Sequence, residues 1–155
     1  LILNVQLGVI NLNAKQYLRQ LRRLNDIVQS KLDQIETLRS LAQKITHVPK
    51  NIKVQESILE DKNSELIAKI VDLENDIKAD IDYLLDLKLK ITHQINSLDN
   101  DDYKLLLMLR YLNFKTWEEI AVEMNCSYQW VHVLHGRALI YFQEKVQFSE
   151  TLDSN

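Results

Sequence analysis

Apolar residues recur every three or four positions through a first long stretch of the chain, from Asn13 to about Thr46. This spacing is typical of an amphipathic helix, and Asn13 is a suitable N-cap residue. About 34 helical residues extend roughly 50 Å at 1.5 Å per residue. A helix of that length with one apolar stripe needs a second long helix to cover the stripe. The stripe consists of Tyr17, Leu21, Leu24, Val28, Leu32, Ile35, Leu38, Ala42 and Ile45.

A second periodic stretch runs from about Ser57 to Ser97, after an interruption at His47–Glu56 where Pro49 disfavours helix. Because one short connection joins two stripes of similar length, the sequence predicts an antiparallel coiled-coil hairpin within one chain. Basic side chains of the first helix would then lie near acidic side chains of the second. A long parallel homodimer stays open as an alternative. The second stripe consists of Leu59, Leu66, Ile70, Leu73, Ile77, Ile81, Leu84, Leu87, Ile91 and Ile95.

The remaining pattern predicts a module of three shorter helices. Asp and Asn residues at Leu98–Asp102 end the second long helix, because these residue types prefer caps and turns to helix interiors. Three periodic segments follow, at Asp101–Tyr111, Thr116–Met124 and Tyr128–Val146.

The last two of these segments have the spacing of a helix-turn-helix. Ala121 is a small residue where the two helices would cross, and Val131, ten positions later, faces inward from the second helix. Between them, Asn125 falls where the chain must adopt a left-handed conformation, which Asn tolerates. Thr116 and Ser127 fit as the N-caps of the two helices. The alternative interpretation is a pair of packed helices that never touches DNA.

The composition agrees with an all-α fold, because the 155 residues include only two glycines and one proline. The predicted architecture is a long antiparallel helical hairpin followed by a three-helix helix-turn-helix module. Its predicted parts are an N-terminal extension (1–12), the coiled-coil hairpin (13–97), the helix-turn-helix domain (98–146) and a flexible acidic tail (147–155).

The charge and the cysteine content of the chain exclude some classes of protein. The formal net charge is −3, which argues against indiscriminate nucleic-acid binding. Residues 12–46 are the basic part, with seven Lys and Arg against three Asp and Glu. The single cysteine excludes an internal disulfide and suits a reducing cytoplasm. Residues 1–11 are apolar but too short to span a bilayer, and the sequence predicts a cytoplasmic protein without a membrane span.

The motif DDYKLLLMLRY followed by TWEEIAVEMNCSYQWVHVLHGRAL resembles region 4 of bacterial sigma factors, which reads the −35 promoter element. Over residues 13–146, the segments NAKQYLRQLRRL, KIVDLENDI and LRYLNFKTWEEIAVEMN resemble late-gene transcriptional regulators of the RinA/ArpU type. These are small proteins of phages and prophages of Gram-positive bacteria. The resemblance implies a DNA-binding regulator that activates phage late genes inside the bacterial host cell. The residues matching the sigma pattern are Thr116, Glu119, Ile120, Ser127, Val131, Ala138 and Leu139.

In this interpretation the last helix enters the major groove of double-stranded DNA. Gln129 can read adenine and Val133 can touch a thymine methyl group, while the other polar side chains reach phosphates. Only one of these side chains is permanently cationic, so a homodimer or RNA polymerase would have to add affinity. If this helix does not bind DNA, the basic face at Arg19, Arg22 and Arg23 is the alternative. The candidate DNA-binding residues are Thr116, Ser127, Tyr128, Gln129, Trp130, His132, Val133 and Arg137.

The sequence predicts a protein that is not an enzyme and holds no metal or cofactor. His132 and His135 have a spacing that could bind zinc, but no third ligand is evident nearby. The Asp and Glu residues between 72 and 86 scatter around a helix surface, and no phosphate-binding glycine loop is present.

Two other functions compete with transcription regulation. A DNA-packaging subunit resembling small terminase subunits would also join a helix-turn-helix to helical oligomerisation elements. A coiled-coil adaptor that binds RNA polymerase or a host protein without touching DNA would suit the acidic module.

Overall fold

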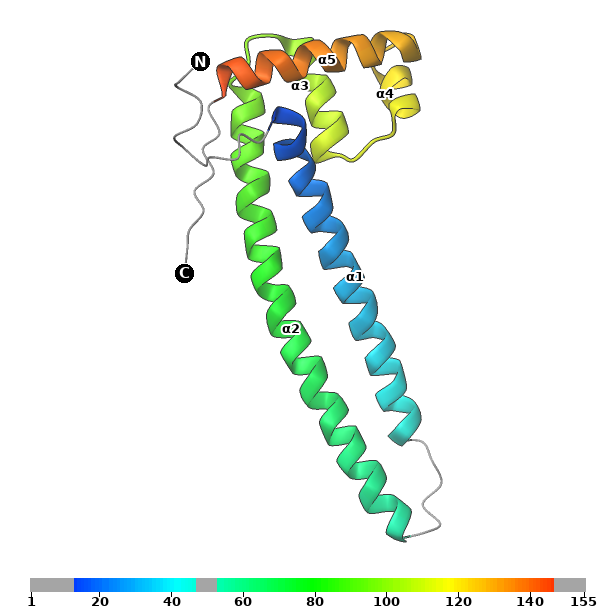
Figure 1. Cartoon of the computed structure of the whole chain (residues 1–155). Helices are drawn as coiled ribbons and strands as arrows, with labels where there is room; N and C mark the ends of the chain where they lie inside the picture. Colours follow the sequence, from blue (N-terminus) through cyan, green and yellow to red (C-terminus); the bar gives the residue numbers. More distant parts are fainter. Residues whose placement is uncertain (1–12, 47–52, 147–155) are drawn as a thin grey trace, which may run out of the picture. The chain divides into compact units, whose positions relative to one another are not determined.

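The computed structural model describes residues 13–46 and 53–146, and within these ranges every regular element is helical. The all-α prediction is therefore confirmed, whereas the predicted extension (1–12), the acidic tail (147–155) and most of the proline-containing connection lie outside the described residues. No described helix has a stretch long and apolar enough to cross a membrane. In chain order the elements are α1 (Ala14–Thr46), α2 (Lys53–Asn96), α3 (Asp101–Leu107), the π-helix η1 (Met108–Leu112), α4 (Trp117–Glu123) and α5 (Tyr128–Lys145) (Figure 1).

Contacts between residues divide the chain into two compact units. The helix-turn-helix unit consists of Leu1–Arg22 and Leu87–Asn155, and the hairpin unit consists of Arg23–Asp86. Both divisions fall inside a long helix. The first turns of α1 and the last turns of α2 therefore share a unit with α3, η1, α4 and α5. The boundary drawn from sequence, after residue 97, instead follows the end of α2 at Asn96.

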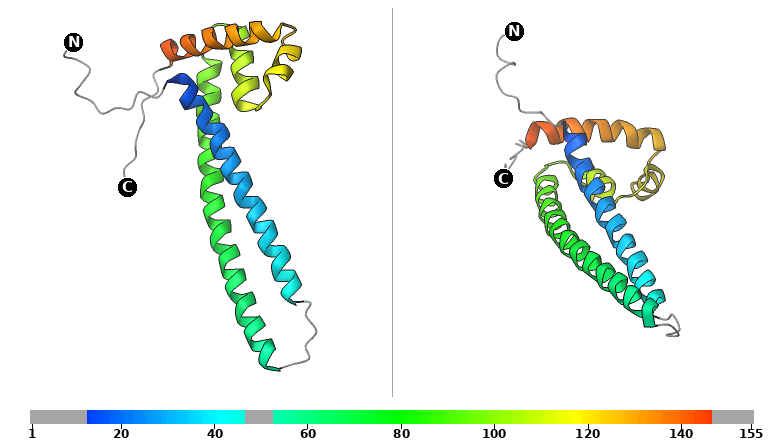
Figure 2. Two further views of the ribbon diagram at one scale, coloured as in Figure 1. Left: turned by 45° about the vertical axis from the view of Figure 1, so that its right-hand side comes forward. Right: turned by 60° about the horizontal axis from the view of Figure 1, so that its bottom comes forward.

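In the hairpin unit, α1 and α2 lie side by side and antiparallel, as predicted (Figures 1 and 2). The core lies between the two apolar stripes, and partly buried Leu38, Leu73 and Leu84 pack against it. Helix formation here depends on this mutual burial, because an isolated helix with one apolar stripe is only marginally stable in water. The buried residues of the core are Val28, Ile35, Leu66, Ile70 and Ile77.

One residue of the predicted α1 stripe was assigned wrongly. Leu32 is 40% exposed, whereas Lys31, its neighbour, is half-buried. Buried Val28 and Ile35 are seven residues apart, and the intervening seam position of a seven-residue repeat falls on residue 31. The stripe therefore passes through a lysine, which a pattern built from apolar residues alone misses.

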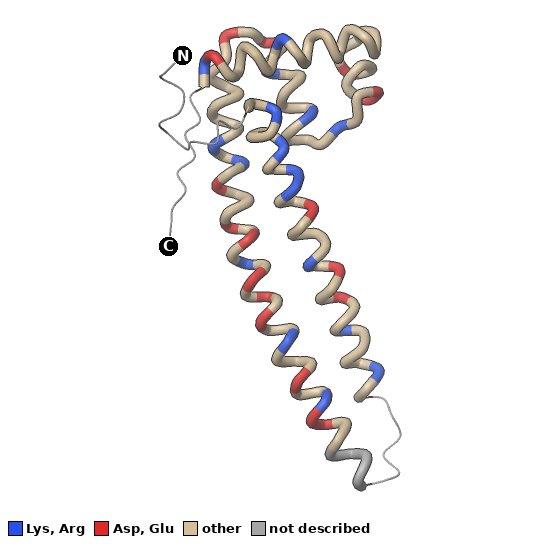
Figure 3. The backbone as a smooth tube through the Cα atoms, in the orientation of Figure 1, with Lys and Arg blue, Asp and Glu red and all other residues tan. Residues whose placement is uncertain are grey.

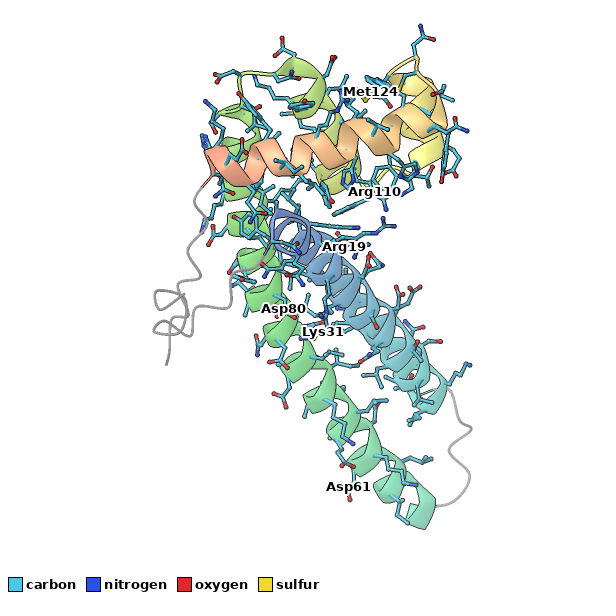
Figure 4. The ribbon with its side chains drawn as sticks, turned by 45° about the horizontal axis from the view of Figure 1, so that its top comes forward. Arg19, Lys31, Asp61, Asp80, Arg110 and Met124 are labelled. Carbon is cyan, nitrogen blue, oxygen red and sulfur yellow. The ribbon has the colours of Figure 1, made fainter. Side chains whose placement is uncertain are left out.

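Lys31 is accommodated at the seam by an acidic partner on α2. Its Nζ lies 2.5 Å from Oδ2 of Asp80, and Figure 4 shows the two side chains meeting between the helices. The hydrogen bond to Asp80 raises the pKa of Lys31. A second pair joins Arg39 to Glu74. Both pairs are partly exposed and contribute little free energy, but they confirm that basic side chains of α1 face acidic side chains of α2.

The buried stripe predicts a large difference between two isoleucines of α2. Ile77 is 4% exposed and Ile67 is 50% exposed. Ile77→Ala should lower the free energy of unfolding by about 2–4 kcal/mol through lost burial and an unfilled cavity. Ile67→Ala, the matched control, should change it by less than about 0.5 kcal/mol. Urea denaturation followed by circular dichroism measures both, and equal losses would show that Ile77 does not face α1.

Candidate nucleic-acid interface

The start of α4 is fixed by reciprocal hydrogen bonds. The Thr116 hydroxyl oxygen accepts the Glu119 backbone N–H at 3.3 Å, and the Glu119 carboxylate accepts the Thr116 backbone N–H at 2.7 Å. This capping box satisfies two backbone donors that a helix end leaves without partners. Hydrogen bonding of the carboxylate with the Thr116 backbone N–H, and then with the Thr116 side chain, lowers the pKa of Glu119, so the carboxylate that holds the cap is ionised.

The turn between α4 and α5 has the conformation that the sequence predicts. Asn125 is left-handed, with φ of 51°, and the Ser127 hydroxyl oxygen accepts the Trp130 backbone N–H at 3.2 Å. Inside the pair, Ile120 and Val131 are fully buried, and α5 also packs against α3. These local features fix which side of α5 remains exposed.

The exposed side of α5, here called the α5 face, contains six of the eight residues selected from sequence. All six are exposed, and α5 crosses α3 steeply so that this side is left uncovered within the unit (Figure 2). The other two, Thr116 and Ser127, are exposed at the starts of α4 and α5. The six residues of the face are Tyr128, Gln129, Trp130, His132, Val133 and Arg137.

Side chains on the α5 face also contact one another. The rings of Tyr128 and His132 have centroids 4.7 Å apart, and the Arg137 guanidinium carbon lies 5.4 Å from the Trp130 ring centroid. Such contacts restrict rotamers before any partner binds. The Gln129 side chain is exposed and makes no hydrogen bond with the described residues. Its amide can therefore bind an external group without breaking an internal contact.

Gly136 is a feature of the α5 face that the sequence patterns did not select. It is exposed in the interior of a helix, with negative φ, and a Cβ atom built on it would meet nothing within 4 Å. A glycine at such a position costs roughly 0.5–1 kcal/mol relative to alanine. No contact within the described structure needs a glycine at this position. The surface at Gly136 has no side chain, and a partner can therefore approach the α5 backbone closely there.

Gly136→Ala should therefore raise the free energy of unfolding by about 0.5–1 kcal/mol, because helix propensity improves and no clash arises. Thermal unfolding followed by circular dichroism provides the measurement. A loss of stability would show that the α5 backbone at this position needs glycine.

The first turns of α1 pack beside α5. The ring of Tyr17 stacks on that of Phe142 at a centroid distance of 6.4 Å, and the Tyr17 hydroxyl donates to Oε1 of Gln94 at 2.7 Å. The Ala14 backbone N–H also donates to Oε1 of Gln143 at 3.1 Å. These contacts fix the phase of α1, so that its polar side faces η1 and the start of α4.

Four cations meet around a cavity of about 390 Å³, here called the basic pocket. Lys15, Arg19 and Arg22 line it from α1, and Arg110 lines it from η1. Figure 4 shows the Arg19 and Arg110 side chains close together, and Figure 3 shows the basic residues on the first turns of α1. None of the described residues that line the pocket is acidic. The pocket adjoins the α5 face, because His132 belongs to both.

Arg110 is held in position in this pocket. Its guanidinium lies over the Trp117 ring, 4.1 Å from the centroid, and it donates to the Lys115 carbonyl oxygen at 2.7 Å. Burial and then the nearby Arg22 guanidinium lower the pKa of Arg110, but a guanidinium remains charged at neutral pH. Trp117 is half-buried in this stack.

The π-helix η1 gives Arg110 its orientation. In η1 the Asn113 backbone N–H donates to the Met108 carbonyl oxygen at 3.0 Å, a bond that spans five residues. Phe114 then adopts a positive φ of 57°, a conformation that costs a residue with a side chain roughly 1–2 kcal/mol. The sequence pattern predicts an ordinary helix here, and Arg110 was not among the candidate site residues.

A buried polar pair forms the floor of the basic pocket. The Tyr111 hydroxyl and Nε2 of His135 lie 2.9 Å apart. Burial raises the pKa of Tyr111 to about 12. Burial, followed by repulsion from Lys15 and Arg110, lowers the pKa of His135 to about 4. Both groups are therefore neutral at neutral pH. The described residues contain no group of three His, Cys, Asp or Glu side chains that could hold a metal ion.

The lowered pKa of His135 predicts a loss of stability on acidification. The unfolded chain binds a proton near pH 6.5, whereas the folded chain does so only near pH 4. Stability from this group is complete above about pH 6.5 and decreases as the pH falls towards 4, by as much as roughly 3 kcal/mol. Urea denaturation of the wild type and of His135→Gln between pH 7.5 and 4 measures the difference.

His93→Gln is the matched control, because His93 is exposed on α2. The His135 variant should lose part of the pH dependence, and the His93 variant should keep it. Identical pH profiles for the wild type and His135→Gln would show that His135 does not cause the loss of stability on acidification.

One comparison with known proteins identifies a family. The family model described as "Protein of unknown function (DUF1492)" matches residues 46–143, more than half of the chain. The chain belongs to the DUF1492 family. No curated protein and no solved structure matches it. The DUF1492 match includes the whole α5 face, whereas Lys15, Arg19 and Arg22 of the basic pocket precede it.

Proposed function

We propose that this protein is a sequence-specific DNA-binding regulator of transcription whose helix α5 enters the major groove. The observation that supports this most directly is the exposed amide of Gln129, near the N-terminus of the second helix of a helix-turn-helix. In that class of module, residues near the start of this helix contact base edges. An uncommitted Gln at this place can accept from and donate to an adenine edge.

The neighbouring side chains suit the other parts of such an interface. Val133, 44% exposed, can contact a thymine methyl group. Tyr128, His132 and Arg137 can reach backbone phosphates, which position a protein without specifying sequence. Ser127 caps the N-terminus of α5 at the start of the α5 face, where backbone N–H groups favour anions, and Thr116 is exposed at the start of α4.

The charge of the protein sets the expected strength of binding. With a net charge of −3 and a single Lys or Arg on the α5 face, one protomer has few phosphate contacts. Affinity should be modest and should decrease quickly with salt. A homodimer or a contact with RNA polymerase would add to it. This fits a phage-type activator of late genes that acts in the cytoplasm of a bacterial host.

The exposed apolar side chains of α5 favour a second candidate, a protein-binding adaptor. Tyr128, Trp130, Val133 and Ile140 are each at least 44% exposed. Aromatic and aliphatic side chains gathered on one surface are typical of protein interfaces. In that case RNA polymerase or another protein would cover the α5 face, and DNA would not.

Two substitutions on α5 separate base reading from phosphate contact. Gln129→Ala should cost roughly 1–3 kcal/mol on the best binding site and little on random duplexes. Arg137→Ala should weaken binding to all sequences alike and lower the salt slope by about one. Fluorescence anisotropy with specific and random duplexes at two salt concentrations measures both effects.

Unchanged DNA binding by both variants would remove the α5 face from the DNA interface. The absence of binding to any duplex by the wild type would favour the adaptor. Each variant should retain the wild-type thermal unfolding curve, because both side chains are exposed.

A further inference from the structure

The basic pocket gathers four cations that form no ion pair with the described carboxylates, although the charge of Glu118 partly offsets the repulsion on Arg110. Among the described residues, Lys15, Arg19 and Arg22 form no ion pair with any carboxylate, although Asp and Glu outnumber Lys and Arg in the chain. Elsewhere in the same unit, Lys145 pairs with Asp99 and Lys115 pairs with Glu123. What sets the pocket apart is that its unpaired cations surround one cavity.

The cations of the pocket repel one another in the absence of a ligand. Arg22 and Arg19 both lower the pKa of Arg110, in addition to burial, and Lys15, Arg110 and Arg19 all act against protonation of His135. An anion bound among these groups would relieve this repulsion and would meet several donors at once. The stack of Arg110 on Trp117 fixes one of those donors before binding, which reduces the entropy lost on binding.

We propose that the basic pocket is a phosphate-binding site and that it holds a backbone phosphate of the DNA duplex read by α5. A planar guanidinium suits bidentate contact with phosphate oxygens, and a cavity of about 390 Å³ accommodates a phosphate group together with its sugar. His132 connects the two surfaces, because it lines the pocket and is exposed on the α5 face. The assignment to DNA rests on the proposed function, whereas phosphate binding itself does not.

The first experiment needs no DNA. Histidine-labelled full-length protein is titrated with sodium phosphate at pH 7, and with sodium chloride at equal ionic strength, while the imidazole NMR signals are recorded. Phosphate should shift the His132 signal, because an anion bound in the pocket changes the electric field at the adjacent ring. The signal of His93, which is exposed and does not line the pocket, should stay in place. Equal effects of phosphate and chloride on His132 would overturn the site.

The second experiment compares two sets of charge removals on α1. In Arg19→Gln/Arg22→Gln the phosphate response of His132 should weaken at least tenfold, and the salt slope for a random 20-base-pair duplex should fall by about one to two. Lys44→Gln removes a charge from an exposed position near the C-terminal end of α1, which does not line the pocket. It should leave both measurements close to the wild type. Thermal unfolding of each variant verifies that the fold persists.

The outcomes show whether the bound phosphate belongs to DNA or to a free compound. They also separate a failure of the basic-pocket proposal from a failure of the proposed function. If the double variant loses the phosphate response but binds DNA like the wild type, the DNA assignment is overturned and the site belongs to a free phosphate compound. If the double variant matches Lys44→Gln in both measurements, the whole inference is overturned. If the wild type responds to phosphate but binds no duplex, the proposed function and the DNA assignment fail together, while phosphate binding stands.

Discussion

The packing of the first turns of α1 against α5 is the contact on which the rest of the helix-turn-helix unit depends. Helices α3 to α5 with η1 amount to fewer than 50 residues, a size at which a single apolar core is marginal. Leu18 and Leu21 of α1 and Ile91 and Ile95 of α2 are fully buried and complete that core. The hairpin helices are thus part of the folded unit that presents α5, in addition to forming a hairpin of their own.

This packing also decides where the charges of α1 lie. Because Leu18 and Leu21 must be buried, the polar side of the same turns is directed to η1 and the start of α4. Arg19 and Arg22 then lie beside Arg110, and a cluster of like charges results from an apolar constraint. The electrostatic cost of the cluster in the free protein is the physical reason for expecting an anionic ligand there.

The parts of the structure that sequence could predict are those governed by local rules. Thr116, Asn125 and Ser127 are fixed by capping and turn chemistry that extends over three or four residues, and their predicted roles are confirmed. Lys31 escaped prediction because its place in the seam depends on Asp80, 49 residues away. The orientation of Arg110 depends on the π-helical register of η1, for which no composition signal is known. The helical spacing of apolar residues predicted which side of α5 is exposed. It does not predict which partner binds to that side.

The proposal that the α5 face enters a DNA groove can be tested directly by NMR, because the chain contains few glycines. The chain has two glycines, and Gly136 lies on that face. Protein labelled with ¹⁵N-glycine should therefore give two backbone amide signals, which substitution of Gly136 assigns. On addition of a DNA duplex, the Gly136 signal should shift or broaden in proportion to the bound fraction. DNA binding that leaves the Gly136 signal in place would contradict the entry of the α5 face into a DNA groove.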